Sequence, residues 1–363
     1  ENNFEPLKLA LSNYLTIQFE TVIMDEASKA TPPELLLPLC FGRKSIVIGD
    51  HRQLPPLLNE KDFKETLLDI NDARATQLAE EIDREFVETS QFKRLILNPQ
   101  VSHTIKSTFN VQYRMHPHIN DVIRQFYLND ESGGLVCGLE KDKVNEHSLV
   151  EPQSRYHGFF HEGFINDDTH TIWVDVDEPE MQDGTSRINE SEVEAIKRVL
   201  LYLKHSEGFE EYMRFWDTIK DEEKRLQEKE IGIISFYGKQ VSKLRETRTL
   251  AKQLGIPIRL KTVDKFQGME RNIIIVSTVR SDKLNKGNNI IVSNSDIGFA
   301  KAPERLNVAL SRSRRLLIVV GNKNFFYKFK DKEGNPIYKN AINEIAKNGK
   351  IIDYKTLNKY VKK

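Results

Sequence analysis

Seven short apolar runs alternate with segments of helical periodicity, and this alternation limits the possible folds more than any other feature of the chain. The runs are rich in Val, Ile and Leu, have the length of strands, and cover residues 21–25, 45–49, 171–176, 231–236, 259–263, 272–278 and 316–321. Near-continuous hydrophobicity is typical of parallel strands that are covered on both faces. The sequence therefore predicts an α/β fold in which helices cover both faces of parallel sheets.

Two helical segments have recognisable boundaries. The first is expected to begin near Asn189, with Glu192 as its capping-box partner. Its apolar stripe consists of Val193, Ile196, Leu200 and Leu203. The second is expected to end at Gly255, because Pro257 follows. Its inward positions are Val241, Leu244, Ala251 and Leu254.

The length of 363 residues predicts two domains. We expect the first to cover residues 1–105 and the second residues 106–345. Residues 346–363 are expected to be a basic tail, because Lys323–Lys363 holds eleven Lys against four acidic residues. Two segments interrupt the regular pattern. Residues 60–88 are expected to form a charged helical stretch, and residues 129–168 an irregular insertion.

The composition limits the compartment and the partners. Basic and acidic side chains balance at 54 each, so any nucleic-acid groove must be local. Cys40 and Cys137 lack the spacing of metal ligands or of a disulfide framework, which fits a reducing compartment. No apolar run has membrane-spanning length and no signal-peptide pattern opens the chain. We therefore expect a cytoplasmic protein without a membrane partner and, because the first residue is Glu1, a fragment or processed chain.

Two acidic residues follow the first strand in Val22–Ser28 (VIMDEAS). Ligands of open α/β sheets bind at the carboxyl ends of the strands. Asp25 can supply a hard oxygen ligand to magnesium, and Glu26 can orient or deprotonate an attacking water. Two acids in this place also commonly mark only the end of a strand, so the motif gains meaning from those that follow.

The second strand turns sharply at Gly49 and Asp50 in Ile48–Pro56 (IGDHRQLPP). The neutral amide of Gln53 can sense a γ-phosphate or the lytic water. Its spacing from Asp25 matches the pattern of nucleotide-driven motors. The two prolines at the end of the motif are interpreted as a turn.

Tyr113 and Arg114 lie in Val111–Pro117 (VQYRMHP). A tyrosine ring can stack on a base, and an arginine supplies a charge-assisted fork for phosphate. An isolated pair of this kind would equally suit a core tyrosine and a surface arginine. The rest of the motif is interpreted as structural.

A strand-to-turn segment carries Thr262–Glu270 (TVDKFQGME). Gln267 and Glu270 are polar groups that can meet a nucleotide, and a carboxylate is a natural acceptor for ribose hydroxyls. Thr262 can instead meet a nucleic-acid phosphate. Gly268 allows close approach of the backbone.

The last motif is Arg305–Arg314 (RLNVALSRSR), and it predicts a helix. The buried stripe of this helix is expected to consist of Leu306, Ala309, Leu310 and Ser313. Arg312 is then left on the flank. An arginine held beside a cleft can act as an arginine finger, which contributes about 10³–10⁵ in rate.

In this order and spacing the five motifs resemble those of the Upf-like branch of superfamily-1B helicases, and the resemblance covers residues 19–322. It implies two RecA-like domains, the first partial and the second complete. It further implies that the domains close on ATP and Mg²⁺ and step 5′ to 3′ along single-stranded DNA or RNA. The motifs do not distinguish DNA from RNA.

The resemblance also implies roles for individual residues. Asp25 is similar to the magnesium-binding acid, Glu26 to the catalytic base, and Gln53 to the γ-phosphate sensor. Tyr113 is similar to the adenine-stacking residue and Glu270 to the ribose contact. Arg114 and Arg312 are similar to the two phosphate-facing arginines. The residues implied to face the nucleic acid are Ser186, Asn189, Ser235, Tyr237 and Thr262.

The chain departs from the family pattern at one point, because no G-x-x-x-x-G-K-[ST] occurs in its 363 residues. We expect the P-loop part of the same protein to lie upstream, and we expect this chain alone not to hydrolyse ATP. The alternative is a non-catalytic nucleic-acid-binding or regulatory module that kept the motor fold. A motor fused to a nuclease would need an acidic or metal cluster of its own, which the sequence does not show.

Overall fold

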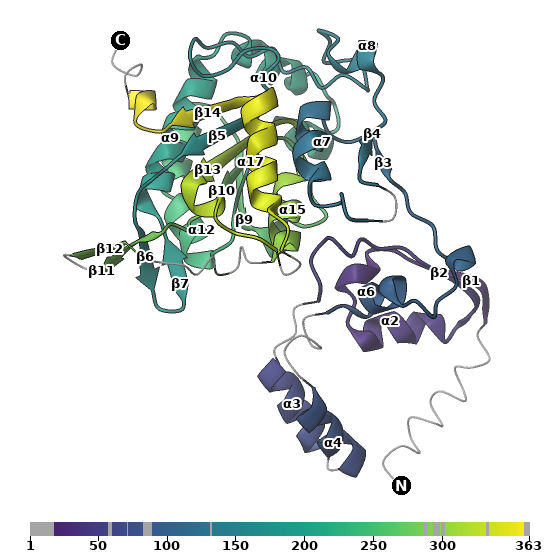
Figure 1. The fold of residues 1–363 in the computed structure, drawn as a ribbon. Helices are drawn as coiled ribbons and strands as arrows, with labels where there is room; N and C mark the ends of the chain where they lie inside the picture. Colours follow the sequence, from purple (N-terminus) through teal and green to yellow (C-terminus); the bar gives the residue numbers. More distant parts are fainter. Residues whose placement is uncertain are drawn as a thin grey trace. The chain divides into compact units, whose positions relative to one another are not determined.

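The computed structural model divides the chain into two compact units, Glu1–Ser107 and Thr108–Lys363 (Figure 1). It describes residues 18–358 apart from 57–59, 71, 83–88, 131–132, 287–288, 293–297, 299–301 and 332–333. Part of the charged stretch expected at residues 60–88 therefore lies outside the described residues. Each unit is considered by itself below.

The first unit contains a small parallel sheet. Strands β1 (Phe19–Met24) and β2 (Gly42–Val47) pair in parallel, with Val22 opposite Ser45. The helices of this unit are α2 (Pro32–Leu39), α3 (Glu60–Asp69), α4 (Ala73–Glu81) and α6 (Gln91–Leu97), with two single turns at Ala27–Lys29 and His103–Ile105. Its buried core is correspondingly small and centres on Ala27, Leu35 and Phe92.

The strands of the first unit are not covered on both faces, contrary to the expectation from their hydrophobicity. The side chain of Ile23 is 65% exposed and that of Ile46 is 50% exposed. Leu36 and Leu37 of α2 are also exposed. The described residues of this unit therefore leave apolar strand and helix surface facing solvent.

The second unit is built on a larger parallel sheet. Within the described residues its strand order is β14-β5-β13-β10-β8-β9, and all pairings are parallel. The strands are β5 (Thr171–Asp175), β8 (Ile231–Ser235), β9 (Ile258–Thr262), β10 (Arg271–Ser277), β13 (Ser313–Gly321) and β14 (Lys350–Asp353). Every residue of β8 and β10 is buried. This confirms the predicted α/β fold with buried parallel strands.

Helices lie on both faces of this sheet. One group packs on the face that carries Ile172, Ile233, Ile275 and Ile318, and consists of α9 (Glu190–His205), α10 (Phe209–Asp217), α12 (Gly238–Leu244) and α13 (Thr247–Gln253). On the other face, α17 (Ile337–Asn348) contacts β5 and β14, and α7 (Pro117–Arg124) contacts β13. Figure 1 shows α17 in front of the sheet and α9 behind it. The remaining helices are α8 (Lys141–Val144), α11 (Glu222–Lys229), α14 (Val263–Phe266), α15 (Pro303–Leu310) and α16 (Lys323–Phe326).

Two smaller sheets complete the second unit. One has the order β12-β11-β6-β7, and its strands are β6 (Glu180–Asp183), β7 (Ser186–Ile188), β11 (Lys283–Lys286) and β12 (Asn289–Val292). The other pairs β3 (Val111–Gln112) with β4 (Val136–Cys137). In the described part of the chain, no helix combines the length and the apolar character needed to cross a membrane.

Residues 346–363 are not wholly a separate tail, so this expectation is wrong for the part that the structure describes. Lys350–Asp353 form β14 and pair with β5, with Ile352 opposite Val174. Ile352 is buried and belongs to the same core cluster as α9. The Lys-rich composition of this segment did not indicate the short strand β14, whose residues add an edge strand to the sheet.

The start of α9 follows the prediction in one respect and departs from it in another. Asn189 is the N-cap, and its side chain accepts a hydrogen bond from the Glu192 N–H at 3.1 Å. Glu192 does not return a capping-box bond, because the main-chain N–H of Asn189 donates to Gln240 Oε1 instead. The Glu192 carboxylate is fully buried and accepts from Ser277 Oγ at 2.6 Å and from the Val279 N–H at 2.8 Å. Burial raises the pKa of Glu192 to about 8.

Candidate functional site

The acidic pair of the first unit lies directly after β1. Both carboxylates are exposed, and Asp25 Oδ1 accepts a hydrogen bond from the Glu26 N–H at 2.8 Å. Glu26 has a φ of 55°, a left-handed conformation that is uncommon outside glycine. Strained backbone of this kind persists only where the surrounding structure holds it, and it is found most often at functional sites.

Local hydrogen bonds join the acidic motif to the glutamine motif. Ser28 Oγ accepts from the Asp50 N–H at 2.6 Å, and the Ala27 N–H donates to the Ile48 carbonyl at 2.9 Å. Gln53 Nε2 in turn donates to Asp50 Oδ2 at 2.9 Å. The loops that follow β1 and β2 therefore lie side by side, as the parallel pairing of the two strands requires.

The close approach of these two loops depends on the glycine between them. A Cβ on Gly49 would lie 2.8 Å from Ser28 Oγ and about as close to the Phe92 ring, at 3.0 Å. Any larger residue would separate the two loops.

Asp25 is suited to contribute one ligand to a hard cation. Its Oδ2 forms no hydrogen bond or ion pair within the described residues, and Mg²⁺ commonly takes one or two carboxylates, with water and phosphate oxygens as the other ligands. Among those residues no group of three or more His, Cys, Asp or Glu side chains could hold a metal ion by itself. The donor set thus fits a cation that a bound phosphate also coordinates.

Three motifs of the second unit meet at an ion pair. Arg114 Nε lies 2.6 Å from Glu270 Oε2, and Arg114 Nη1 lies 3.5 Å from the Ser311 carbonyl. The His116 N–H also donates to the Arg314 carbonyl at 3.0 Å. Both members of the ion pair are partly exposed, so a ligand can reach them.

A buried arginine supports the loop that carries Tyr113 and Arg114. Arg155 Nε donates to the Arg114 carbonyl at 2.6 Å, and its Nη2 donates to the Tyr113 carbonyl at 2.8 Å. Burial lowers the pKa of Arg155 to about 10. Sequence reasoning missed this residue because it lies within 129–168, where no periodicity or motif distinguishes one arginine from another.

Tyr113 presents its ring to solvent, with 65% of the residue exposed. The ring packs over Gly138, where an added Cβ would lie 2.5 Å from the tyrosine Cε1. An exposed aromatic face in this position is available for stacking. Its placement depends on a residue without a side chain at position 138.

Arg312 does not lie on the flank of a helix, so that expectation is wrong. It is buried in the turn between α15 and β13, where its Nε donates to the Val308 carbonyl and its Nη2 to Ser311 Oγ, both at 2.9 Å. Ser311 thus contacts both Arg114 and Arg312.

Gln267 lies three residues before Glu270. Its Nε2 is buried and has no hydrogen-bond partner in the described part of the structure.

The five residues expected to face nucleic acid are divided between the interior and the surface. Asn189, Ser235 and Tyr237 are buried, so the expectation that their side chains face a ligand is wrong for this structure. Asn189 caps α9, Ser235 Oγ donates to the Ser277 carbonyl, and the Tyr237 hydroxyl accepts from Arg280. Ser186 and Thr262 are half-buried. Thr262 ends β9 opposite Ser235 of β8, at the carboxyl edge of the sheet.

Comparisons with known proteins identify the family of the chain. A family model described as an AAA domain matches residues 87–324, and a second model with the same description matches residues 8–61. The chain is 30% identical over 318 residues to the DNA polymerase alpha-associated DNA helicase A of Saccharomyces cerevisiae, which covers 84% of this chain and 38% of that protein. It is 27% identical over 315 residues to the ATP-dependent helicase NAM7 of the same yeast, covering 85% of this chain and 26% of that protein.

An archaeal relative extends the match over nearly the whole chain. The chain is 28% identical over 356 residues to an ATP-dependent helicase of Methanocaldococcus jannaschii, covering 95% of this chain and 41% of that protein. The chain belongs to the Upf-like superfamily-1 helicases. It spans about two fifths or less of the length of these curated relatives.

Proposed function

We propose that the chain forms part of an ATP-dependent helicase that moves 5′ to 3′ along single-stranded nucleic acid. In this proposal ATP is hydrolysed where two RecA-like units meet. The first unit contributes the acids and Gln53, and the second contributes Tyr113, Glu270 and the arginines. Membership of the helicase family supports ATP use and a nucleic-acid substrate.

The observation that carries the proposal is the meeting of three separate motifs at the Arg114–Glu270 pair. Besides its ion pair with Glu270, Arg114 lies 3.5 Å from the carbonyl of Ser311, whose hydroxyl accepts a hydrogen bond from Arg312. Residues distant in sequence thus come together in the second unit. Two guanidinium groups close to one serine can stabilise the charge that develops on a transferred phosphoryl group. The Gln267 Nε2, which is buried and has no hydrogen-bond partner among the described residues, supplies a further donor for a polar ligand.

The residues of the first unit would act on the water and the metal. Asp25 would hold Mg²⁺ through its free carboxylate oxygen, and the cation would neutralise phosphate charge when bound. Glu26, whose carboxylate is exposed beside it, would orient the attacking water and accept its proton. Gln53, fixed by Asp50, would sense the γ-phosphate.

We propose that this chain alone does not complete the ATP site. It contains no G-x-x-x-x-G-K-[ST], so it lacks the backbone cradle and the lysine that bind the phosphates in related motors. The exposed apolar side chains of β1, β2 and α2, such as Ile23 and Ile46, support the presence of further strands beside them in the complete protein. The P-loop part of the same protein would be the covering segment.

ATP turnover tests the proposal directly. The 363-residue chain is compared with a longer form to which a P-loop segment of the protein is added, each with and without single-stranded DNA and RNA. We expect turnover only in the longer form, stimulated by the preferred strand and abolished by Glu26→Gln. Turnover by the short chain that Glu26→Gln abolishes would contradict the incomplete site. Silence of both forms would favour a non-catalytic binding module.

A further inference from the structure

We propose that a basic hollow beside strand β9 binds the sugar-phosphate backbone of single-stranded nucleic acid, as an extension of the contact assigned to Thr262. This inference rests on the proposed function, because it assumes a strand that reaches Thr262. It adds residues that belong to none of the five motifs apart from Thr262 and Lys265.

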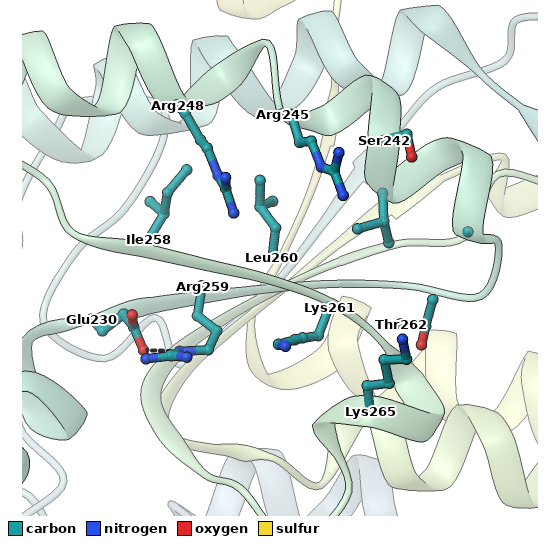
Figure 2. Close-up of a pocket in the computed structure, with 12 residues that line it drawn as sticks. Glu230, Ser242, Arg245, Arg248, Ile258, Arg259, Leu260, Lys261, Thr262 and Lys265 are labelled. Atoms are coloured by element: carbon teal, nitrogen blue, oxygen red, sulfur yellow. Dashed lines mark hydrogen bonds and ion pairs between the residues drawn. The ribbon is translucent and has the colours of Figure 1, made fainter.

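The hollow lies along the edge of the larger sheet and has a volume of about 510 Å³. In the described part of the chain β9 has a neighbouring strand, β8, on one side only. Five cationic side chains and one carboxylate line the hollow: Arg245, Arg248, Arg259, Lys261, Lys265 and Glu230. Figure 2 shows Arg245 and Arg248 pointing from the helical segment toward the strand that carries Leu260. In a chain with no net charge, such a concentration of positive charge is local.

Most of these cations have no partner among the residues that the structure describes. Arg259 Nε lies 2.8 Å from Glu230 Oε2, and that carboxylate is shared with Arg271. Among the described residues, no ion pair or side-chain hydrogen bond engages the other four, Arg245, Arg248, Lys261 and Lys265. They therefore repel one another with only partial compensation, and an anionic ligand would relieve that repulsion.

The two lysines within α12 have carboxylate partners. Lys239 Nζ lies 3.3 Å from Asp183 Oδ2, and Lys243 Nζ lies 3.0 Å from Glu190 Oε1. Neither Lys239 nor Lys243 lines the hollow. Arg245, the C-cap of α12, and Arg248 of α13 do line it, and they have no ion pair among the described residues.

Protection of the sheet edge does not account for the arrangement. Lys and Arg on an edge strand prevent pairing with another chain, and Arg259 and Lys261 of β9 can serve that purpose. Arg245 and Arg248 lie on the helical segment rather than on the strand. Edge protection gives no reason for two further arginines to face the same hollow.

The lining favours a phosphate backbone over exposed bases. Ser242 and Thr262 add hydroxyl groups, Gly238 leaves backbone accessible, and no lining residue is aromatic. Nonspecific affinity for nucleic acid comes mainly from Lys and Arg that neutralise phosphates, whereas base contact in single-strand sites uses aromatic stacking. Because Thr262 lies at one end of the lining, a strand that contacts Thr262 can continue into the hollow.

Salt dependence of strand binding tests the inference in the complete 363-residue chain. Binding of fluorescein-labelled homopolymeric DNA and RNA strands is followed by anisotropy between 50 and 200 mM salt. For single strands the slope of log K against log salt is about 0.7 per neutralised phosphate. We expect Arg245→Ala/Arg248→Ala to reduce the slope by about 1.4 and to weaken binding at the higher salt. Arg245→Lys/Arg248→Lys should retain most of the slope, because it keeps both charges.

Lys239→Ala/Lys243→Ala is the matched control, since it removes two paired cations from α12, the helix that ends directly before Arg245. It should leave the slope unchanged. Wild-type binding with an unaltered slope in Arg245→Ala/Arg248→Ala overturns this inference and leaves the proposed function intact. Failure of the wild-type chain to bind any strand overturns both. Binding of polyglutamate with an affinity equal to that for nucleic acid, lost in the same variant, would identify an acidic peptide as the ligand and overturn the inference as well.

Discussion

Arg155 donates a hydrogen bond from Nε to the main-chain carbonyl of Arg114 at 2.6 Å. A residue in an irregular segment therefore fixes the backbone of the arginine that pairs with Glu270. The same guanidinium reaches the Tyr113 carbonyl, so one side chain sets the position of both expected nucleotide contacts in this loop.

Removal of this support should destabilise the second unit and misplace the loop. Arg155→Ala leaves the two carbonyls without their donor, and an unsatisfied buried group costs about 1–3 kcal/mol. We expect the free energy of unfolding in urea to fall by at least that amount. Lys224→Ala, at an exposed residue of α11, should change it by less than about 0.5 kcal/mol. Equal effects of the two substitutions would show that Arg155 is not a structural support.

Arg114 should affect catalysis far more than stability. The ion pair with Glu270 is partly exposed, so its contribution to folding should be within about 0–1 kcal/mol. In the longer form that carries the P-loop, we expect Arg114→Ala to lower kcat by about 10³-fold or more, with an unchanged melting temperature. Arg114→Lys should rescue it poorly, because a lysine lacks the planar fork. Arg198→Ala, whose arginine pairs with Glu194 on α9, is the control and should retain the wild-type kcat.

Gly138→Ala should weaken nucleotide binding through the Tyr113 ring. The added Cβ would lie 2.5 Å from the Tyr113 ring and 2.6 Å from Val111 Cγ1, and both of these residues are exposed, so their side chains can move away. We expect KM for ATP in the longer form to rise several-fold with little change in unfolding temperature. Gly238→Ala is the matched control when KM is measured without nucleic acid, since Gly238 lines the basic hollow but an added Cβ there meets no atom within 4 Å. An unchanged KM in Gly138→Ala would indicate that Tyr113 does not contact the base.

A buried histidine cluster should make the second unit sensitive to acid. The rings of His116 and His170 stack with centroids 3.4 Å apart, and His157 lies beside them, 4.9 Å from His170. Burial lowers the pKa of His116 to about 3 and that of His157 to about 4, and it holds the pKa of His170 well below its ordinary value of 6.5. The unfolded chain therefore binds more protons than the folded chain once the pH falls below about 6.5.

Stability from this cluster is accordingly present above pH 6.5 and is lost as the pH falls toward 4. Each histidine can contribute up to about 1.4 kcal/mol per pH unit in that window. Urea denaturation at pH 7, 6 and 5 measures the slope, which should be smaller in His116→Gln. His103→Gln, at an exposed histidine, should keep the wild-type slope. A flat profile between pH 7 and 5 would contradict the prediction.

Glu192 should have the opposite pH dependence. Its folded pKa of about 8 lies above the ordinary value of 4.5, so the folded state binds the extra proton. This contribution to stability is complete below pH 4.5 and is lost as the pH rises through about 8. Glu192→Gln removes the titration, so the variant should gain stability relative to the wild type as the pH rises from 5 to 8. A pH-independent difference between the two proteins would show that Glu192 does not titrate in this range.

The parallel strands and the boundary of α9 could be predicted because they depend on local patterns. Val193, Ile196, Leu200 and Leu203 are buried as their spacing requires. The single helix expected up to Gly255 was wrong, since α12 ends at Leu244 and α13 begins at Thr247. The Thr247 hydroxyl donates to the Leu244 carbonyl at 2.7 Å, and this local bond competes with the helical pattern. Apolar periodicity continues across the break and does not reveal it.

The site could be predicted only as far as its motifs extend. Arg114 and Glu270 were expected near a nucleotide, but their direct pairing depends on how the second unit brings distant segments together. The burial of Asn189, Ser235 and Tyr237 likewise follows from tertiary packing around Gln240 and Arg280. No local sequence pattern shows whether a polar residue faces a ligand or forms a hydrogen bond with a buried partner.

The Ser28–Asp50 hydrogen bond has a consequence for how this protein can be divided or recombined. The acids, the glutamine and the serine that links their loops are contained in fewer than thirty consecutive residues, 25–53. Short-range contacts within that segment join the two loops, while the pairing of β1 with β2 and the Phe92 side chain support them from outside it. Domain exchange that keeps residues 19–97, from β1 to α6, would therefore transfer the acids and the sensor together with the Phe92 packing beneath them.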